Sequence, residues 1–106
     1  MEYLVRLTDR AFRDFGAIYE FIEADSSESA FAWFNGLAEA IHSLERFAER
    51  VSPIPEDKKL RHLLFGKKPN TYRIIYALDK RKNSVDVFHI RHGAMAPLSP
   101  EQETQP

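Results

Sequence analysis

The chain has 106 residues, of which 43% are hydrophobic, and it contains no cysteine. This length allows one domain with its own core, and the lack of cysteine excludes disulfides, thiolate zinc sites and a cysteine nucleophile. No apolar run approaches the ~18 residues of a membrane-spanning helix, and the N-terminus lacks the apolar region of a signal peptide. We therefore expect a cytoplasmic protein that does not enter membranes.

The net charge of −1 conceals an uneven distribution along the chain. Residues 1–57 carry five basic and 12 acidic side chains, whereas residues 58–93 carry ten basic and two acidic ones. The resulting local charges are −7 and +8. A polyanion senses charge within roughly 10 Å at physiological salt, so a +8 segment folded into one sheet favours an anionic partner despite the near-neutral total.

The chain begins with a predicted strand and helix. Tyr3–Leu7 has the composition of a short strand, and Thr8 or Asp9 is placed to cap the helix that follows it. The apolar positions of this helix are three and four residues apart and form one stripe: Ala11, Phe15, Ile18 and Ile22, with Phe12 and Tyr19 beside them. The helix therefore has one face suited to packing on a core.

A second helix is predicted after the polar interruption at residues 25–28. Asp25 and Glu28 have the spacing of a capping box at its start, and Pro53 and Pro55 are expected to end it. Its apolar seam alternates steps of four and three without a break: Ala30, Phe34, Leu37, Ile41, Leu44, Ala48 and Val51. The short connection predicts an antiparallel helical hairpin. We interpret the aromatic residues of the two helices as core packing: Phe12, Phe15, Phe21, Phe31, Trp33 and Phe34.

The periodicity changes from helical to strand-like after the second helix. Leu60–Phe65, Tyr72–Leu78 and Val85–Ile90 are short runs of β-branched or aromatic residues, bounded by turn residues. The expected order is therefore β-α-α-β-β-β, an α+β fold with the helical hairpin packed on one face of a small, mainly antiparallel sheet. The domain is expected to span residues 1–95, and the polar, Pro-rich tail 96–106 is expected to be disordered.

Alternation along the middle strand of this meander separates two sets of side chains. Arg73, Ile75 and Ala77 share one face, and Tyr72, Ile74, Tyr76 and Leu78 share the other, which we assign to the helices. Arg73 is then expected on the sheet face that no element of this chain covers. There it is either an ordinary solvated arginine or one that contacts an anion.

Alternation does not assign the two faces of the last strand in the same way. Alternation groups Val87, His89 and Arg91 on one side and Phe88, Ile90 and His92 on the other, and neither side is uniformly apolar. Because His89 and His92 fall on opposite faces, they are poorly placed to share a metal ion, and we expect neither a metal nor a cofactor. Any of the four histidines could act as a general base near neutral pH, and spacing does not select one.

The basic residues near the predicted sheet face are the strongest functional signal in the composition. Arginine suits bidentate contact with phosphate or carboxylate, and lysine suits looser attraction to phosphate. The sequence has no Gly-rich phosphate loop, nucleophile elbow or zinc-protease motif. The basic set comprises Lys58, Lys59, Arg61, Lys67, Lys68, Arg73 and Arg91.

The sequence resembles the RelE/ParE family of bacterial toxin–antitoxin toxins over about residues 3–95. The resemblance rests on the order of elements and on three segments, SSESAFAWFNGLAEAIHSLERF, YRIIYALD and VDVFHIRHG. It implies a compact α+β toxin that a cognate antitoxin wraps and holds inactive in a toxin–antitoxin hetero-oligomer. Toxins of this family either cleave mRNA on the ribosome or, in the ParE branch, poison DNA gyrase.

The resemblance also implies roles for individual residues. Arg73, within YRIIY, matches the position whose arginine contacts the scissile phosphate in the ribonuclease branch, where it stabilises transition-state charge. The second arginine and the tyrosine that this branch places after the last strand are missing from residues 93–97. A ribonuclease site would rely on Arg73, Arg61, His89 and His92. Contact with a target or nucleic acid would involve Lys58, Lys59, Lys67, Lys68 and Arg91.

Three functional hypotheses remain open. The first is a toxin that inhibits growth through a ParE-like target such as DNA gyrase, which the missing terminal arginine and the IRHG ending of the last strand favour. The second is a RelE-like, ribosome-dependent mRNA endoribonuclease, so the sequence leaves open whether the chain is an enzyme. The third is a non-toxic relative that only binds an antitoxin or nucleic acid.

Overall fold

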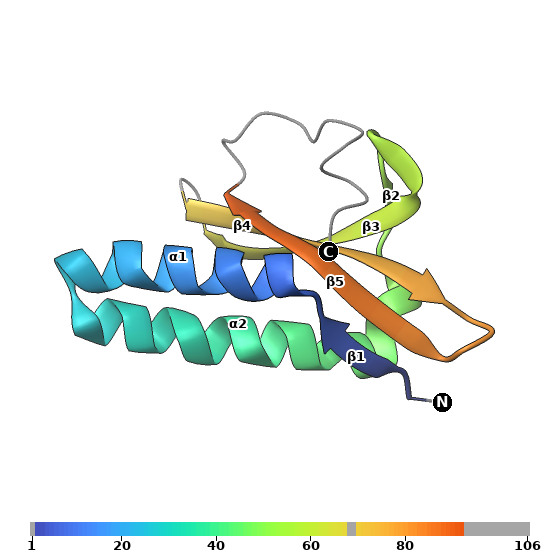
Figure 1. Cartoon of the computed structure of the whole chain (residues 1–106), viewed down its shortest axis with the longest axis horizontal. Coiled ribbons are helices and arrows are strands. Elements are labelled where there is room, and N and C mark those ends of the chain that lie inside the picture. Colours follow the sequence, from blue (N-terminus) through green and yellow to red (C-terminus); the bar gives the residue numbers. More distant parts are fainter. Residues whose placement is uncertain (1, 68–69, 93–106) are drawn as a thin grey trace.

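A computed structural model describes residues 2–67 and 70–92. Its elements follow the predicted order, with a 3-10 turn and a short strand added after the second helix: β1 (Leu4–Leu7), α1 (Asp9–Asp25), α2 (Ser27–Phe47), η1 (Ala48–Arg50), β2 (Pro53–Ile54), β3 (Asp57–Lys67), β4 (Asn70–Asp79) and β5 (Ser84–His92). The α+β fold, with the helical hairpin on one face of the sheet, is confirmed (Figure 1). The tail 96–106 lies outside the described residues.

The five strands form one mixed sheet in the order β1-β5-β4-β3-β2. β1 runs parallel to β5, and the other neighbours are antiparallel. This topology follows from the hairpin, because the two helices must cross one face of the sheet before the meander of β3, β4 and β5 can return beside β1. Within the described residues, neither helix is long and apolar enough to span a membrane.

Side-chain caps set where both helices begin. Thr8 caps α1, as predicted, because its Oγ1 accepts a hydrogen bond from the backbone N–H of Ala11 at 3.2 Å. The cap of α2 is Ser26, whose Oγ accepts a hydrogen bond from Ser29 N at 3.1 Å. The prediction of Asp25 is wrong by one residue, because Asp25 still belongs to α1. A single residue therefore separates the two helices, which fold back into the hairpin (Figure 1).

The second helix ends before the prolines that were expected to end it. α2 stops at Phe47, and η1 carries the chain on toward the sheet. The hydroxyl of Tyr76 donates a hydrogen bond to Ala48 O at 2.7 Å, which ties η1 to β4, and burial raises the pKa of Tyr76 to about 12. Pro53 lies in β2, the last strand in the sheet order, where the missing N–H of proline is tolerated.

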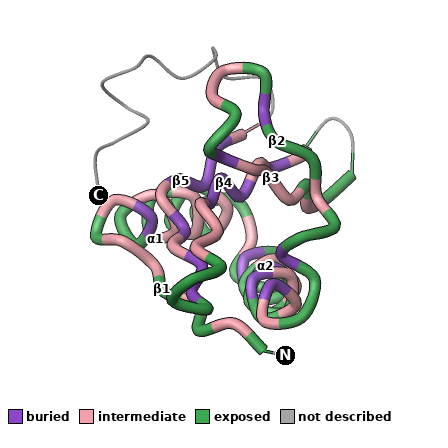
Figure 2. The backbone as a smooth tube through the Cα atoms, turned by 90° about the vertical axis from the view of Figure 1, so that its right-hand side faces the viewer, coloured by how far each residue is buried: buried purple, intermediate pink, exposed green. Residues whose placement is uncertain are grey.

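The main core lies between the hairpin and the sheet. Leu37 and Leu44 of α2 are fully buried, together with Ile74 and Tyr76 of β4. Figure 2 shows buried stretches on both α2 and the sheet. The ring of Tyr72 meets Trp33 at a centroid distance of 5.6 Å. The predicted assignment of one face of this strand to the helices is therefore confirmed.

The sheet face away from the helices is not bare, contrary to the sequence-based expectation. Ile54, Leu60 and Ile75 form a second buried cluster on this face, with Ala77 and Phe88 packed against it. The β2–β3 hairpin rises from the sheet on the side away from the helices (Figure 1), and it contributes Ile54. β2 was missed because a strand of two residues, one of them a proline, is too short to show any periodicity.

A bulge in β5 explains why alternation could not assign the faces of this strand. The register between β4 and β5 shifts by one residue at Phe88. Val87 and Ile90 both enter the helix-side core, whereas Phe88 packs on the second cluster and His89 pairs with Ile75 of that same cluster. The predicted groupings of Val87 with His89, and of Phe88 with Ile90, are therefore wrong.

Candidate functional site on the sheet face

Two of the predicted site residues lie side by side on the sheet face away from the helices. Arg73 of β4 and Arg91 of β5 are direct cross-strand partners, so their side chains leave the same face. Both are largely enclosed: the side chain of Arg73 is 15% exposed and Arg91 is 7% exposed. Burial and the neighbouring charge of Arg73 lower the pKa of Arg91. Two enclosed cations this close require anionic partners.

Glu56 supplies one such partner from the turn between β2 and β3. The guanidinium of Arg73 donates two parallel hydrogen bonds to its carboxylate, from Nη1 to Oε2 at 3.0 Å and from Nη2 to Oε1 at 3.1 Å. The side chain of Glu56 is only 13% exposed. This is the bidentate geometry in which arginine binds carboxylate and phosphate most strongly. The fork of Arg73 is therefore filled by the chain itself.

His62 of β3 accepts a hydrogen bond from a third donor of the same arginine. Arg73 Nε donates a hydrogen bond to His62 Nδ1 at 3.0 Å, which requires an unprotonated Nδ1 and hence a neutral imidazole. Burial and the positive charge of Arg73 lower the pKa of His62, with Glu56 opposing them. His62 therefore accepts from Arg73 at neutral pH, and Glu56 and His62 together fix the orientation of the guanidinium.

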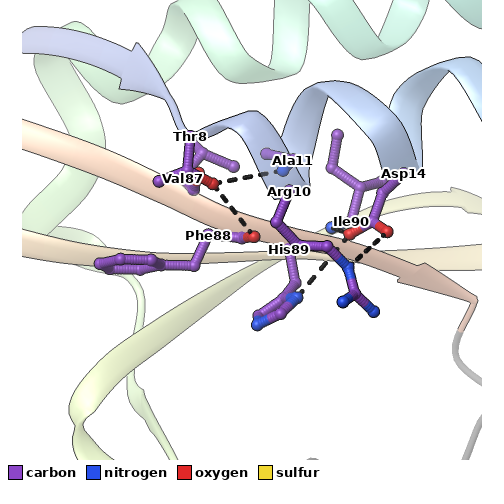
Figure 3. A network of polar contacts seen from close by, with 8 residues as sticks. All are labelled: Thr8, Arg10, Ala11, Asp14, Val87, Phe88, His89 and Ile90. Carbon is purple, nitrogen blue, oxygen red and sulfur yellow. Dashed lines mark hydrogen bonds and ion pairs between the residues drawn. The ribbon is translucent and has the colours of Figure 1, made fainter. Parts of the chain in front are cut away.

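A second acid, Asp14 of α1, lies beside β5 (Figure 3), and its charge opposes the lowering of the pKa of Arg91. Its carboxylate accepts hydrogen bonds from Arg10 Nε at 3.2 Å and from the backbone N–H of Ile90 at 3.1 Å, and it lies 3.8 Å from His89 Nδ1. Burial alone would raise the pKa of Asp14, but the contact with His89 and the hydrogen bonds from Ile90 and Arg10 outweigh it and lower the pKa.

Arg61 does not join this cluster. It pairs with Tyr76 across β3 and β4 and therefore faces the helices. There its Nη1 donates hydrogen bonds to the carbonyl oxygens of Glu49 at 3.2 Å and Val51 at 2.5 Å. The sheet thus separates Arg61 from Arg73, and Arg61 closes the end of η1.

The remaining predicted residues are also spread out. His92 meets the ring of Tyr72 at 5.3 Å on the helix side, so it lies on the opposite face from His89, as predicted. Among residues 2–67 and 70–92, no group of three or more His, Asp or Glu side chains could hold a metal ion. Lys58, Lys59 and Lys67 of β3 are exposed, and Lys68 lies outside the described residues.

The sequence therefore singled out the two arginines as candidates but not the groups that surround them. Glu56 had no distinguishing spacing, because it follows a strand too short to predict. Asp14 is one of several acidic residues on α1, and nothing in the chain marks it as the one that meets β5. Its role depends on β1 ending at Leu7, which leaves the next part of β5 to face the helix.

A second feature is an apolar surface on the helical hairpin. The prediction of core packing is confirmed for Phe15 and Trp33, which pack against the main core, and is wrong for the other four aromatic residues. Phe12 and Phe31 are each 63% exposed, Phe34 is 42% exposed and Phe21 is 80% exposed. Two adjoining grooves, of ≈ 470 Å³ and ≈ 400 Å³, share Phe15 and Phe34. We call this surface the aromatic face; it comprises Phe12, Phe15, Phe31, Phe34 and Ala38. A seam position such as Phe34 was assigned to the core because helical spacing alone does not distinguish two apolar faces.

A helical hairpin on one face of a mixed five-stranded sheet, with the first strand parallel to the last, defines an α+β fold of the RelE/ParE type. The family described as "ParE toxin of type II toxin-antitoxin system, parDE" matches residues 5–97. The chain belongs to this ParE toxin family of type II toxin–antitoxin systems. Among curated proteins, none matches the sequence.

Solved structures share the fold at low sequence identity. The chain is similar to a protein of the chromosomal ParDE system from P. aeruginosa, with a TM-score of 0.68, 17% identity, and 86% of this chain and 96% of that chain covered. The RelBE2 toxin–antitoxin complex from Mycobacterium tuberculosis matches with a TM-score of 0.55 and 24% identity, and the match covers 87% of this chain and 99% of that chain. A doubly mutated E. coli toxin RelE in the free state matches with a TM-score of 0.53 and 16% identity, and the match covers 89% of this chain and 86% of that chain.

Proposed function

We propose that this toxin inhibits bacterial growth through a ParE-like target such as DNA gyrase, and that a cognate antitoxin holds it inactive. The observation that supports this choice of target is the set of hydrogen bonds that Arg73 makes within the chain. Its fork binds Glu56 and its Nε binds His62, so it is not presented to a substrate. The match to the ParE family supports the same branch.

The positions of the other ribonuclease candidates support this choice. A phosphoryl-transfer site needs its acid, base and cation around one phosphate. Here Arg61 is bound to backbone carbonyls on the helix side, and His92 packs on Tyr72. His89 lies beside Asp14 and is 0% exposed. These three residues and Arg73 would have to rearrange from both faces of the sheet to act together.

The aromatic face supports the antitoxin as partner. Exposed aromatic side chains that adjoin continuous grooves are typical of surfaces that another protein covers. Glu20 and Glu45 line these grooves, so the complementary ligand is an amphipathic helix with an apolar stripe and basic flanking residues. The antitoxin would bury the aromatic face and form a toxin–antitoxin hetero-oligomer.

The target is tested by controlled expression in bacteria while incorporation of labelled thymidine and labelled methionine is followed in one culture. Early loss of thymidine incorporation with translation intact is expected, together with inhibition of gyrase supercoiling by the purified protein. Early collapse of methionine incorporation would favour the RelE-like endoribonuclease instead. No change in either label would contradict the proposal and leave a non-toxic binding module.

A paired substitution separates the role of Arg73 in activity from its role in folding. Arg73→Ala alone leaves the enclosed Glu56 carboxylate without its bidentate partner, at a cost of about 3–5 kcal/mol in the free energy of unfolding. The double variant E56A/R73A removes both charges and is the fairer test. We expect it to remain toxic. Loss of toxicity in a double variant that unfolds at the wild-type temperature would support the ribonuclease.

The partner surface is tested by the double variant F12S/F34S on the aromatic face. We expect it to lose co-purification with the product of an adjacent antitoxin gene while keeping its fold. The matched control is Leu64→Ser, which removes another exposed apolar residue, 56% exposed, from β3. Retained binding by F12S/F34S, or equal loss in the control, would exclude the aromatic face as the antitoxin surface.

A further inference from the structure

The closed end of the helical hairpin, where α1 turns into α2, extends past the sheet (Figure 1). On α1, Phe15 and Ile18 pack against the main core, and no residue of this helix after Ile18 joins it. Phe21, in the next turn, is 80% exposed, more than any other large hydrophobic residue among residues 2–67 and 70–92. Phe21 is not part of the aromatic face, so neither the core nor that surface accounts for its exposure.

A groove of ≈ 750 Å³ adjoins Phe21 at this end of the molecule. We call it the tip groove; side chains from both helices and from the start of β4 line it, among them Phe21, Asp25, Ser29, Trp33, Asn70 and Tyr72. A second groove of ≈ 450 Å³ shares Phe21, Asn70 and Tyr72 with it and continues along α1. Neither has a lining residue in common with the two grooves of the aromatic face. The tip groove is therefore a separate surface.

The charge of the tip groove is negative. Asp25 is exposed, and within the described residues no basic side chain forms an ion pair with it. It is the last residue of α1, where the negative end of the helix dipole adds to its charge, and no basic residue stands in the last turn. Residues 14–45 contain seven acidic side chains and no lysine or arginine. The groove therefore favours a cationic ligand.

The aromatic lining of the groove favours the same kind of ligand. Phe21, Trp33 and Tyr72 contribute rings, and those of Trp33 and Tyr72 meet edge to face at a centroid distance of 5.6 Å. The face of an aromatic ring attracts a cation, most strongly for tryptophan. Arginine suits this setting better than lysine, because its planar guanidinium stacks on rings and also binds a carboxylate through two hydrogen bonds. Its methylene stem packs on apolar surface.

We propose that the tip groove receives an arginine side chain from a protein partner, with the guanidinium held by the aromatic rings and by the carboxylate of Asp25. The adjoining groove receives an apolar side chain next to this arginine in the partner. The partner is thus one that exposes a segment in which arginine adjoins an apolar residue. This inference is independent of the gyrase proposal, because it concerns a binding surface on the isolated chain and not the cellular target.

The test is an NMR titration of the isotope-labelled full chain with the blocked dipeptide acetyl-Leu-Arg-amide. Trp33 is the only tryptophan, so its indole N–H gives a single cross peak that reports on the groove. We expect this peak to shift saturably. The same dipeptide with citrulline, the neutral isostere of arginine, should bind about tenfold more weakly. Equal binding of the two dipeptides, or an unmoved Trp33 peak, would overturn the proposal without the need for any variant.

Variants of the groove separate the charge of Asp25 from the ring of Phe21. Asp25→Asn should raise the dissociation constant of acetyl-Leu-Arg-amide about tenfold, and Phe21→Leu, which keeps an apolar side chain, about threefold. The matched control is Glu23→Gln, which removes an exposed carboxylate from the same turn of α1 that does not line the groove. It should bind like the wild type. Unchanged binding by Asp25→Asn, or equal weakening in the control, would contradict the assignment of Asp25.

A second copy of this chain is the competing occupant, because residues 58–93 carry a net charge of +8 that complements the acidic hairpin. Dilution of the protein without peptide distinguishes the two. A Trp33 peak that moves with protein concentration, together with a rise in molecular mass by light scattering, would assign the groove to self-association and overturn the proposal. A peak that stays in place on dilution and moves with acetyl-Leu-Arg-amide would support a separate protein partner.

Discussion

Asp14 on α1 accepts a hydrogen bond from the backbone N–H of Ile90 on β5 at 3.1 Å (Figure 3). A helix side chain thus supplies the acceptor that the backbone of a neighbouring strand would otherwise provide. β1 pairs with β5 only as far as Val87. Thr8 continues the coverage, because its backbone N–H and Oγ1 both donate to Val87 O, at 3.0 and 3.1 Å. The start of α1 therefore satisfies backbone hydrogen-bonding groups on an edge of β5 that would otherwise be open to pairing with another chain.

Removing this carboxylate should destabilise the protein in a pH-dependent way. Asp14→Ala leaves the N–H of Ile90 without its acceptor, at an expected cost of about 1–3 kcal/mol in the free energy of unfolding at pH 7. Because the folded-state pKa of Asp14 lies below its ordinary value of 3.8, the stabilising effect of Asp14 is complete above that value and is lost as the pH falls through the folded pKa. Urea unfolding at neutral and acid pH checks both points.

The control for this variant is Glu20→Ala, an exposed acidic residue on the same helix. It should change the free energy of unfolding by less than about 0.5 kcal/mol at either pH. A cost for Asp14→Ala that does not shrink in acid would contradict the role given to the Asp14 carboxylate.

His62 should make stability fall below neutral pH. Its folded-state pKa is lowered from 6.5, so the neutral form stabilises the protein fully above pH 6.5. That stability is lost as the pH drops from 6.5 through the folded pKa, because protonation of Nδ1 removes the acceptor for Arg73. His62→Asn keeps an acceptor that does not titrate, so its unfolding free energy should vary less over this range. Equal slopes for His62→Asn and wild type would refute the assignment.

Arg61 should matter for folding and not for activity. Arg61→Met keeps the apolar stem but leaves the carbonyl oxygens of Glu49 and Val51 without their donor, at an expected cost of about 1–2 kcal/mol in the free energy of unfolding. Lys59→Met, at an exposed position of the same strand, should cost less than about 0.5 kcal/mol. Abolished growth inhibition by an Arg61→Met variant that is no less stable than wild type would instead place Arg61 in an active site.

The aromatic face should contribute little to the stability of the isolated chain. Phe12→Ser should change the free energy of unfolding by less than about 0.5 kcal/mol, because Phe12 is 63% exposed. Leu37→Ala, at a fully buried position of α2, should cost about 2–5 kcal/mol. Chemical denaturation of both variants tests the contrast. Equal losses would mean that Phe12 belongs to the core.

Elements marked by a long periodic pattern of apolar residues could be predicted from the sequence. Features that depend on one or two residues could not. Long apolar periods located both helices and the three later strands, because many residues contribute to each signal. The two-residue strand β2 and the extra residue at Phe88 have no period to detect. The site followed the same rule. Arg73 was located by the alternation of β4, whereas Glu56 was missed because a turn reaches Arg73 only in three dimensions.

The bulge at Phe88 also governs how sequences of this kind can be compared. Residues before it and after it alternate out of phase, so β5 behaves as two short strands joined by one inserted residue. An alignment with a relative that has a regular last strand needs a one-residue gap at this point. Without the gap, Arg91 would be matched to a side chain on the wrong face of the sheet, and its partnership with Arg73 would vanish from the comparison.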